Sequence, residues 1–373
     1  MIFSKMTLKY FFLVCLVTGF NSTVVAQRND TWTAFWANDS IHIGYKDSRG
    51  MVQIEPKFMG YSSAHKFDNI IAVSEETDGG WKNYYLTKEG REVGLGQLHI
   101  YDNGVDCESE GFIRFRDPET DQTGLFNSKG DIVIPAIYND LTRVRNGMVV
   151  ALKGAEKKYW NHGNHAGCNH FSWSGGEEVL LDTANQVLIE NFAYDNAINL
   201  YSLEKSSTPS LDSTRKEFVG TDGLTYSFVD FETEFRQWLT DDLFVNLTEE
   251  KLIQASYHTL TWESATGWAT TNKEQFIKDN FAILKKGLLE IVQPNCDYFI
   301  SQDGLNSFIF EGAEFEHYFT NCGEAKNWQY PTMTLVISHQ NKKSFTQNHF
   351  EFLRTAAGYQ LISVTIRNEK VKG

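Results

Sequence analysis

The feature that most constrains the fold is a short motif that returns at a fixed interval. Gly50, Gly90 and Gly130 follow one another every 40 residues, and each lies between two short runs of alternating apolar and polar residues. A fourth copy has Asn185 in place of the glycine and comes 55 residues after the third, which indicates an insertion of fifteen residues. Self-similarity at such a period predicts a repeat architecture.

Each copy has the local chemistry of a β-hairpin. The tip of a two-residue hairpin often needs φ > 0, which glycine adopts without steric cost and asparagine tolerates. The alternation after the turn, as in Ile132 and Ile134, is typical of a half-buried strand. Pro56 and Pro135 lie at matching positions, where a residue that cannot donate to a ladder ends a strand or lies at a sheet edge. The sequence therefore predicts antiparallel hairpin repeats, arranged either like a propeller or as an open stack.

Two of the copies also resemble a known family. GYKDSRG at 44–50 with IEPKF at 54–58, and GLFNSKG at 124–130 with IVIPAIY at 132–138, resemble the WG-repeat family of bacterial proteins. The resemblance covers about residues 40–195, two units well and two poorly, and no Trp-Gly pair opens a unit. It implies a β-rich binding or scaffolding module without chemistry of its own, so the catalytic residues stay unknown.

The first 26 residues have the layout of a secretory signal peptide. Lys5 and Lys9 precede an apolar run at 10–17, and small residues before Gln27 suggest cleavage after Ala26. The apolar run is too short to span a bilayer, and Val14 stands before Cys15 where a lipoprotein has a smaller residue, so a membrane or lipid anchor is the weaker interpretation. Because no later stretch reaches transmembrane length, we expect export to the periplasm or the extracellular medium without a transmembrane segment.

The charge of the chain limits its partners. The formal net charge is −14, and it becomes −16 when the two lysines of the signal peptide are removed. Nucleic acid and anionic lipid surfaces would be repelled, whereas cationic peptides, divalent cations and neutral glycans remain open. Aromatic residues make up 14% of the chain, which suits strand packing and also sugar binding. We expect the partner to be a protein or an envelope glycan, and not a nucleic acid.

The segment that contains the insertion in the fourth copy, residues 160–176, carries the most chemistry. Its candidate metal ligands are His162, His165, Cys168 and His170. Imidazole and thiolate suit zinc or copper, and a glycine-rich loop is able to wrap four donors around one ion. The alternative is a surface hairpin in which the histidines are polar filler. Trp160 and Trp173 are candidates for a ligand-binding platform, and no other cofactor is expected.

Four cysteines remain after the signal peptide, and they allow three pairings. Cys296 and Cys322 lie in the same later region on neighbouring strand candidates, so we predict a disulfide between them. Cys107 and Cys168 would then be free or paired with each other, unless Cys168 binds a metal.

A change of composition divides the chain. The repeat region is expected over 27–202, a polar segment at 203–222 is predicted to be a linker, and residues 223–370 are predicted to form an α+β domain. Helical spacing appears at 229–239 and from Thr248 and Asn272, and strands are predicted at 298–300, 307–310, 315–319, 333–339, 349–355 and 360–366. This order predicts helices packed on a curved antiparallel sheet.

The end of this region is similar to another family. The run HFEFLRTAAGYQLISVTI at 349–366 looks like the end of the cone-shaped NTF2-like domains, which serve as enzymes, ligand binders or dimerisation modules. If a cone forms, the ionisable residues expected nearest its mouth are His258, Glu263, Glu316, His317 and His349.

The sequence lacks the nucleophile elbow, the zinc-protease motif and the glycine fingerprints of nucleotide-binding enzymes. We therefore expect an exported, non-catalytic binding or scaffold protein that uses its β-repeat surface. The alternative is a hydrolase or isomerase with its pocket in the C-terminal α+β domain.

Overall fold

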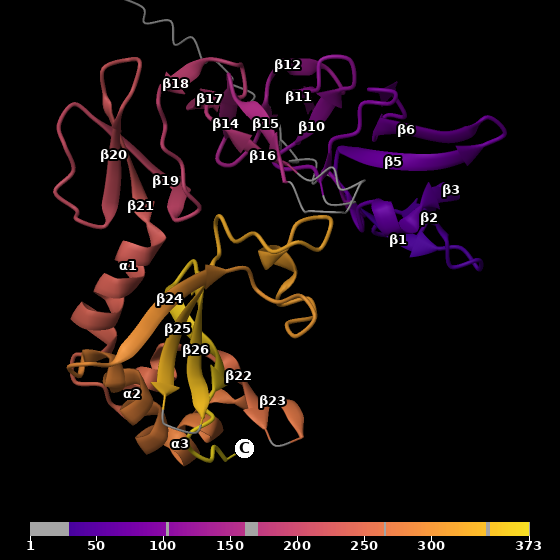
Figure 1. Cartoon of the computed structure of the whole chain (residues 1–373). Coiled ribbons are helices and arrows are strands. Elements are labelled where there is room, and N and C mark those ends of the chain that lie inside the picture. Colours follow the sequence, from indigo (N-terminus) through magenta and orange to yellow (C-terminus); the bar gives the residue numbers. More distant parts are fainter. Residues whose placement is uncertain (1–29, 102–103, 161–170, 265, 341–343, 373) are drawn as a thin grey trace, which may run out of the picture.

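The computed structural model describes residues 30–101, 104–160, 171–264, 266–340 and 344–372. These residues are mostly antiparallel β-structure, and Figure 1 shows several sheets succeeding one another along the first half of the chain. The second half contains a six-stranded sheet with helices beside it. Within the described residues, no helix has the length and apolar character needed to cross a bilayer. The predicted signal peptide lies outside the described residues.

The predicted repeat units are each built from three strands. In every unit the middle strand pairs antiparallel with the strands before and after it. The first two units merge into one seven-stranded sheet of order β4-β1-β2-β3-β5-β6-β7. The four units are β1 (Trp32–Trp36), β2 (His42–Lys46) and β3 (Val52–Met59); β5 (Ile70–Thr77), β6 (Gly80–Thr87) and β7 (Glu92–Val93); β10 (Phe112–Asp117), β11 (Gln122–Asn127) and β12 (Ile132–Tyr138); and β14 (Met148–Lys153), β17 (Glu177–Asp182) and β18 (Val187–Ile189).

Shorter elements lie between the units. They are η1 (Gly60–Ser62), β4 (Lys66–Phe67), β8 (Ile100–Tyr101), β9 (Gly104–Val105) and β13 (Asp140–Leu141). The insertion in the fourth unit forms a separate hairpin of β15 (Glu156–Tyr159) and β16 (Phe171–Ser174).

The turns of the units share one hydrogen-bond pattern. Gly50 has φ of +80° and donates its N–H to the Asp47 carbonyl, while the Asp47 N–H donates to the carbonyl of Met51. Asn185, with φ of +64°, donates to the carbonyl of Asp182 in the same way. The left-handed residue is therefore confirmed, although the hairpin is the longer type in which a turn is followed by a bulged glycine.

Apolar clusters lie between successive units. Leu125 packs with the fourth unit, for example against Val149, whereas its neighbour Phe126 packs with the second unit, including Tyr85. Since successive side chains of a strand point to opposite faces, the middle strands of the third and fourth units are buried on both sides. Each unit thus depends on its neighbours for a core.

The segment at 203–222, predicted to be a linker, is instead part of a sheet. β19 (Ile198–Ser206), β20 (Arg215–Val219) and β21 (Thr225–Asp230) form three strands of order β19-β21-β20. The N–H of Gly223 donates to the Gly220 carbonyl, and the N–H of Gly220 donates to the Leu224 carbonyl. These two hydrogen bonds make a fifth turn of the repeat pattern. The sequence concealed it because the apolar partners of this sheet, such as Phe218 and Phe228, follow a long polar stretch.

The C-terminal sheet has six strands of order β23-β22-β27-β26-β25-β24, all antiparallel except the pair β22–β27. Thr248 and Asn272 cap α2 and α3 by accepting hydrogen bonds from Lys251 and Glu274, as the sequence predicts. The elements are α1 (Phe231–Gln237), the π-helix η2 (Trp238–Leu243), α2 (Glu249–Gln254), β22 (Ser256–Ser264), β23 (Gly267–Asn272), α3 (Lys273–Leu288), η3 (Leu289–Val292), β24 (Asp297–Asp303), η4 (Glu316–Tyr318), β25 (Thr332–Gln340), β26 (Phe345–Thr355) and β27 (Gly358–Thr365).

Different elements pack on the two faces of this sheet. Apolar residues of α3, including Phe276 and Leu284, pack with Phe352 and Leu361 on one face. Leu353 and Ile362, the next residues along the same strands, point to the other face and pack with residues of the segment 304–331. We call this segment, which connects β24 to β25, the docking segment.

The docking segment contains turns and η4, so the strands predicted at 307–310 and 315–319 are wrong. Its aromatic residues, including Phe310, Phe315 and Tyr318, are buried against the face of the sheet that α3 does not cover. This packing needs no strand pairing. Figure 1 shows the segment in orange, extending from β24 toward the N-terminal sheets.

The docking segment is joined to the repeat units covalently. Cys322 forms a disulfide with Cys107, 215 residues earlier, and Cys296 is a free thiol. The predicted Cys296–Cys322 bridge is therefore wrong, because the docking segment leaves the sheet immediately after β24 and carries Cys322 to the repeats. Around the disulfide, the His65 N–H donates to the Asn321 carbonyl at 2.8 Å.

We expect Cys322→Ser to lower the free energy of unfolding by about 2–5 kcal/mol, because the bond removes the entropy of a very long open loop from the unfolded chain. Chemical denaturation without reductant measures this change. Cys296→Ser is the matched control and should cost much less, since its thiol makes no bond. Recovery of a peptide linked through Cys296 and Cys322 from the unreduced protein would contradict the pairing.

Candidate binding site

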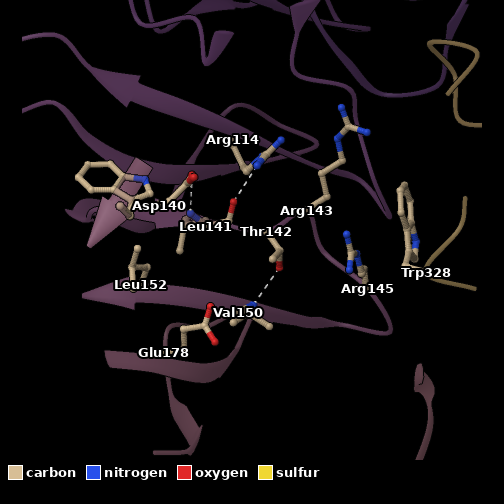
Figure 2. A pocket seen from close by; sticks show the side chains of 11 residues that line it. Arg114, Asp140, Leu141, Thr142, Arg143, Arg145, Val150, Leu152, Glu178 and Trp328 are labelled. Carbon is tan, nitrogen blue, oxygen red and sulfur yellow. Dashed lines mark hydrogen bonds between the residues drawn. The ribbon is translucent and has the colours of Figure 1, made fainter. Parts of the chain in front are cut away.

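A pocket of about 440 Å³ opens where the third and fourth repeat units meet the docking segment. Figure 2 shows its wall, in which three arginines lie along one side and an indole from the docking segment stands beside one of them. The lining residues are Arg114, Asp140, Leu141, Thr142, Arg143, Arg145, Val150, Leu152, Trp173, Glu178 and Trp328.

Two of the arginines lie on either side of a core residue. Val144 is buried in the core between the third and fourth units. Its neighbours Arg143 and Arg145 line the pocket instead. Arg145 and Met148 exchange backbone hydrogen bonds of 2.9 and 3.1 Å across the turn at Asn146, which holds this edge in place.

Two of the arginines share one buried carboxylate. Asp106 accepts hydrogen bonds from Arg114 Nη2 at 2.6 Å and from Arg143 Nε at 2.9 Å. Burial alone would raise the pKa of Asp106, but the two guanidinium groups hold it well below its ordinary value. Arg143 also pairs with Glu324 of the docking segment. A continuous ionic chain thus crosses from the repeats to the docking segment beside the disulfide.

Arg145 lies in a different environment. Its guanidinium lies 4.6 Å from the centre of the Trp328 ring and 5.8 Å from that of Tyr194, whose hydroxyl accepts a hydrogen bond from Nη1. Among the described residues no carboxylate pairs with Arg145, and its buried Nε has no acceptor. Burial lowers the pKa of this guanidinium below its ordinary value, and Arg114 and Arg143 lower it further. An anion in the pocket would relieve this unfavourable electrostatic state.

The pocket also offers oxygen atoms. Asp140 accepts a hydrogen bond from the Leu141 N–H at 2.9 Å, and Glu178 accepts one from the Tyr194 N–H at 3.2 Å. Burial alone would raise the pKa of Asp140, but contacts with His99 and Arg114 hold it below its ordinary value. A ligand with both an anionic group and hydroxyl groups would therefore find partners of both kinds here.

The two tryptophans of the predicted platform belong to the hairpin of β15 and β16. Trp173, on β16, lines the pocket. Trp160 does not line this pocket; its indole is 51% exposed and donates to the Ser172 hydroxyl at 3.4 Å.

The predicted metal ligands His162, His165, Cys168 and His170 lie outside the described residues. In the part of the chain that the structure describes, no group of three or more His, Cys, Asp and Glu side chains is arranged to hold a metal ion.

Sequence reasoning missed the arginines and Trp328. The pair Arg143 and Arg145, on either side of one apolar residue in an acidic chain, is a local signal of two cations on one strand face. Trp328 gives no such signal, because its place depends on the docking segment, whose course follows from packing and not from a local pattern.

The ionisable residues expected at a cone mouth do not converge on one site. His258 pairs with Glu314 at 3.0 Å, and Glu316 pairs with Lys66 of the repeats at 2.8 Å. Among the other members, Glu263 pairs with Arg367, and burial and the same arginine lower the pKa of His349. The ring of His317 lies beside that of Tyr318.

Comparisons with known proteins assign no family to this chain. No protein-family model, no curated protein and no solved structure matches the chain.

The C-terminal sheet contains a carboxyl group whose environment disfavours its charge. Burial, together with the nearby charge of Asp303, raises the pKa of Glu351 on β26 from 4.5 to about 6. Because the pKa of Glu351 is higher in the folded state than in the unfolded state, the carboxyl is protonated at low pH and does not destabilise the fold there. Stability is lost as the pH rises through about 6, by about 2 kcal/mol in total.

We expect Glu351→Gln to increase the free energy of unfolding near pH 8 by about 1–2 kcal/mol and to change it little near pH 4. Denaturant unfolding at the two pH values measures the difference, and Glu89→Gln, in an exposed turn, is the control. An equal effect of Glu351→Gln at both pH values would contradict the titration of this carboxyl.

Proposed function

We propose that the chain is an exported, non-catalytic binding protein with two domains, a WG-like β-repeat domain and a C-terminal α+β domain of NTF2-like type. In this proposal the docking segment fastens the second domain to the first, and the pocket that it completes receives the ligand. The ligand would be an envelope glycan or part of a protein.

The observation that carries the proposal is the state of Arg145. A guanidinium that is partly buried between two aromatic rings, with Nε unpaired among the described residues, is costly to the isolated protein. Such a cost is understandable if a ligand supplies the missing acceptor. The pocket volume of about 440 Å³ falls within the range of small-molecule sites, roughly 300–1,000 Å³.

Export is supported by two independent features. The N-terminal residues have the layout of a signal peptide. The Cys107–Cys322 disulfide is compatible with an oxidising compartment, where such bonds persist. The periplasm and the extracellular medium both fit.

The alternative, a hydrolase or isomerase of the C-terminal domain, has less support. The sheet face that α3 covers is filled by apolar side chains, including Phe276 and Phe350, which leaves little room there for two converging polar groups. A zinc or copper ion at His162, His165, Cys168 and His170 would strengthen this alternative. Elemental analysis of the purified protein and of Cys168→Ser tests for it.

We expect the protein to bind a member of a glycan array or of a peptide library, and Trp173→Ala to weaken that binding about tenfold or more, because it removes an aromatic wall of the pocket. Trp81→Ala is the matched control, since this indole is 54% exposed on β6 and does not line the pocket. Equal weakening by both substitutions, or no binding of any glycan or peptide, would contradict the proposal.

A further inference from the structure

We propose that the pocket binds an acidic oligosaccharide and that Arg145 holds the carboxylate of one of its uronate residues. This inference rests on the binding function proposed above and names the chemistry of the ligand.

Arg145 has the properties of a carboxylate receptor. A guanidinium has five N–H donors in a planar fork that matches two carboxylate oxygens. One donor, on Nη1, is used by the Tyr194 hydroxyl, and the rings of Trp328 and Tyr194 fix the plane of the group. A preorganised, poorly solvated fork forms stronger charge-assisted hydrogen bonds than an exposed arginine.

The surrounding charges favour a singly charged anion over a phosphate. Arg114 and Arg143 are already paired with Asp106, and Arg143 is paired with Glu324 as well. The other lining carboxylates, Asp140 and Glu178, add two further negative charges. A phosphate monoester, with a charge of about −1.5 to −2, would be repelled more strongly by these groups than a carboxylate. The single guanidinium without a carboxylate among the described residues matches one negative charge.

The overall charge of the chain does not prevent this binding. The formal net charge of −14 is spread over 373 residues. Charges in solvent farther away than about 8–10 Å are largely screened at physiological salt, whereas a direct contact in a pocket is screened much less. Long polyanions such as nucleic acids still meet repulsion outside the pocket, but a short acidic sugar does not extend far enough to do so.

The remaining lining residues favour a sugar over a peptide terminus. Sugar hydroxyls donate hydrogen bonds, and Asp140, Glu178 and the hydroxyl of Thr142 provide acceptors in the same wall. Trp173 adds an aromatic surface, which is suited to the apolar face of a pyranose ring. A peptide carboxylate would use Arg145 equally well, but a peptide main chain offers one N–H donor per residue, whereas a uronate residue offers several hydroxyl donors.

Isothermal titration calorimetry of the full-length mature protein tests the inference with three probes. These are a short oligogalacturonate, the same oligosaccharide with its carboxylates reduced to alcohols, and a peptide with a free C-terminus. We expect the oligogalacturonate to bind about ten- to a hundredfold more tightly than the reduced sugar, because only the former pairs with the guanidinium. Equal affinity for the two sugars would overturn the role of the carboxylate.

Variants of Arg145 locate the contact. Arg145→Gln should reduce affinity for oligogalacturonate to that for the reduced sugar, and Arg145→Lys should restore only part of it, because an ammonium lacks the planar fork. Arg236→Gln, which removes an exposed arginine paired with Glu232 on α1, should leave affinity unchanged. Circular dichroism and the melting temperature check that each variant is folded.

The outcomes separate this inference from the proposed function. Binding of the peptide but of neither sugar would overturn the inference and leave the binding function standing. Binding of oligogalacturonate that Arg145→Gln does not weaken in a folded protein would overturn the assignment to this pocket. Absence of binding to all three probes overturns the inference, and the wider glycan and peptide screen then decides on the binding function itself.

Discussion

The pocket depends on one junction, at which the docking segment is held against the third repeat unit and the strand before it. The Cys107–Cys322 disulfide makes the junction covalent, and the neighbouring chain Asp106–Arg143–Glu324 makes it ionic. Without it, the pocket would lose the wall that carries Trp328, and Arg145 would lose the ring that orients it. The junction therefore links the stability of the fold to the geometry of the candidate site.

Local sequence patterns were sufficient to predict the repeat turns but not to predict the docking segment that joins the repeats to the C-terminal sheet. The turns at Gly50 and Asn185 could be predicted because a left-handed residue at a hairpin tip has a strong and local sequence preference. The fifth turn, at Gly223, was hidden by the polar strand before it, since Phe218, near the end of β20, is the residue of this strand that packs against the apolar core. Strands were wrongly predicted in the docking segment because aromatic residues that pack on a sheet face give the same signal as residues of a strand.

The candidate site could be predicted only in part for the same reason. Trp173 could be identified because a tryptophan in a glycine-rich insertion stands out in the sequence. The cysteine pairing was predicted from proximity along the chain, whereas the actual partner is 215 residues away. Arg145 and Trp328 come from different halves of the chain, and their contact is a product of tertiary packing that single-sequence patterns do not contain.

The position of the disulfide in the chain also has a consequence for biogenesis. Cys107 leaves the ribosome 215 residues ahead of Cys322. All the repeat units have emerged by then, so they can be complete while the pocket still lacks its last wall. The order of synthesis therefore runs from the repeats to the pocket, and the pocket closes only when nearly the entire polypeptide has emerged.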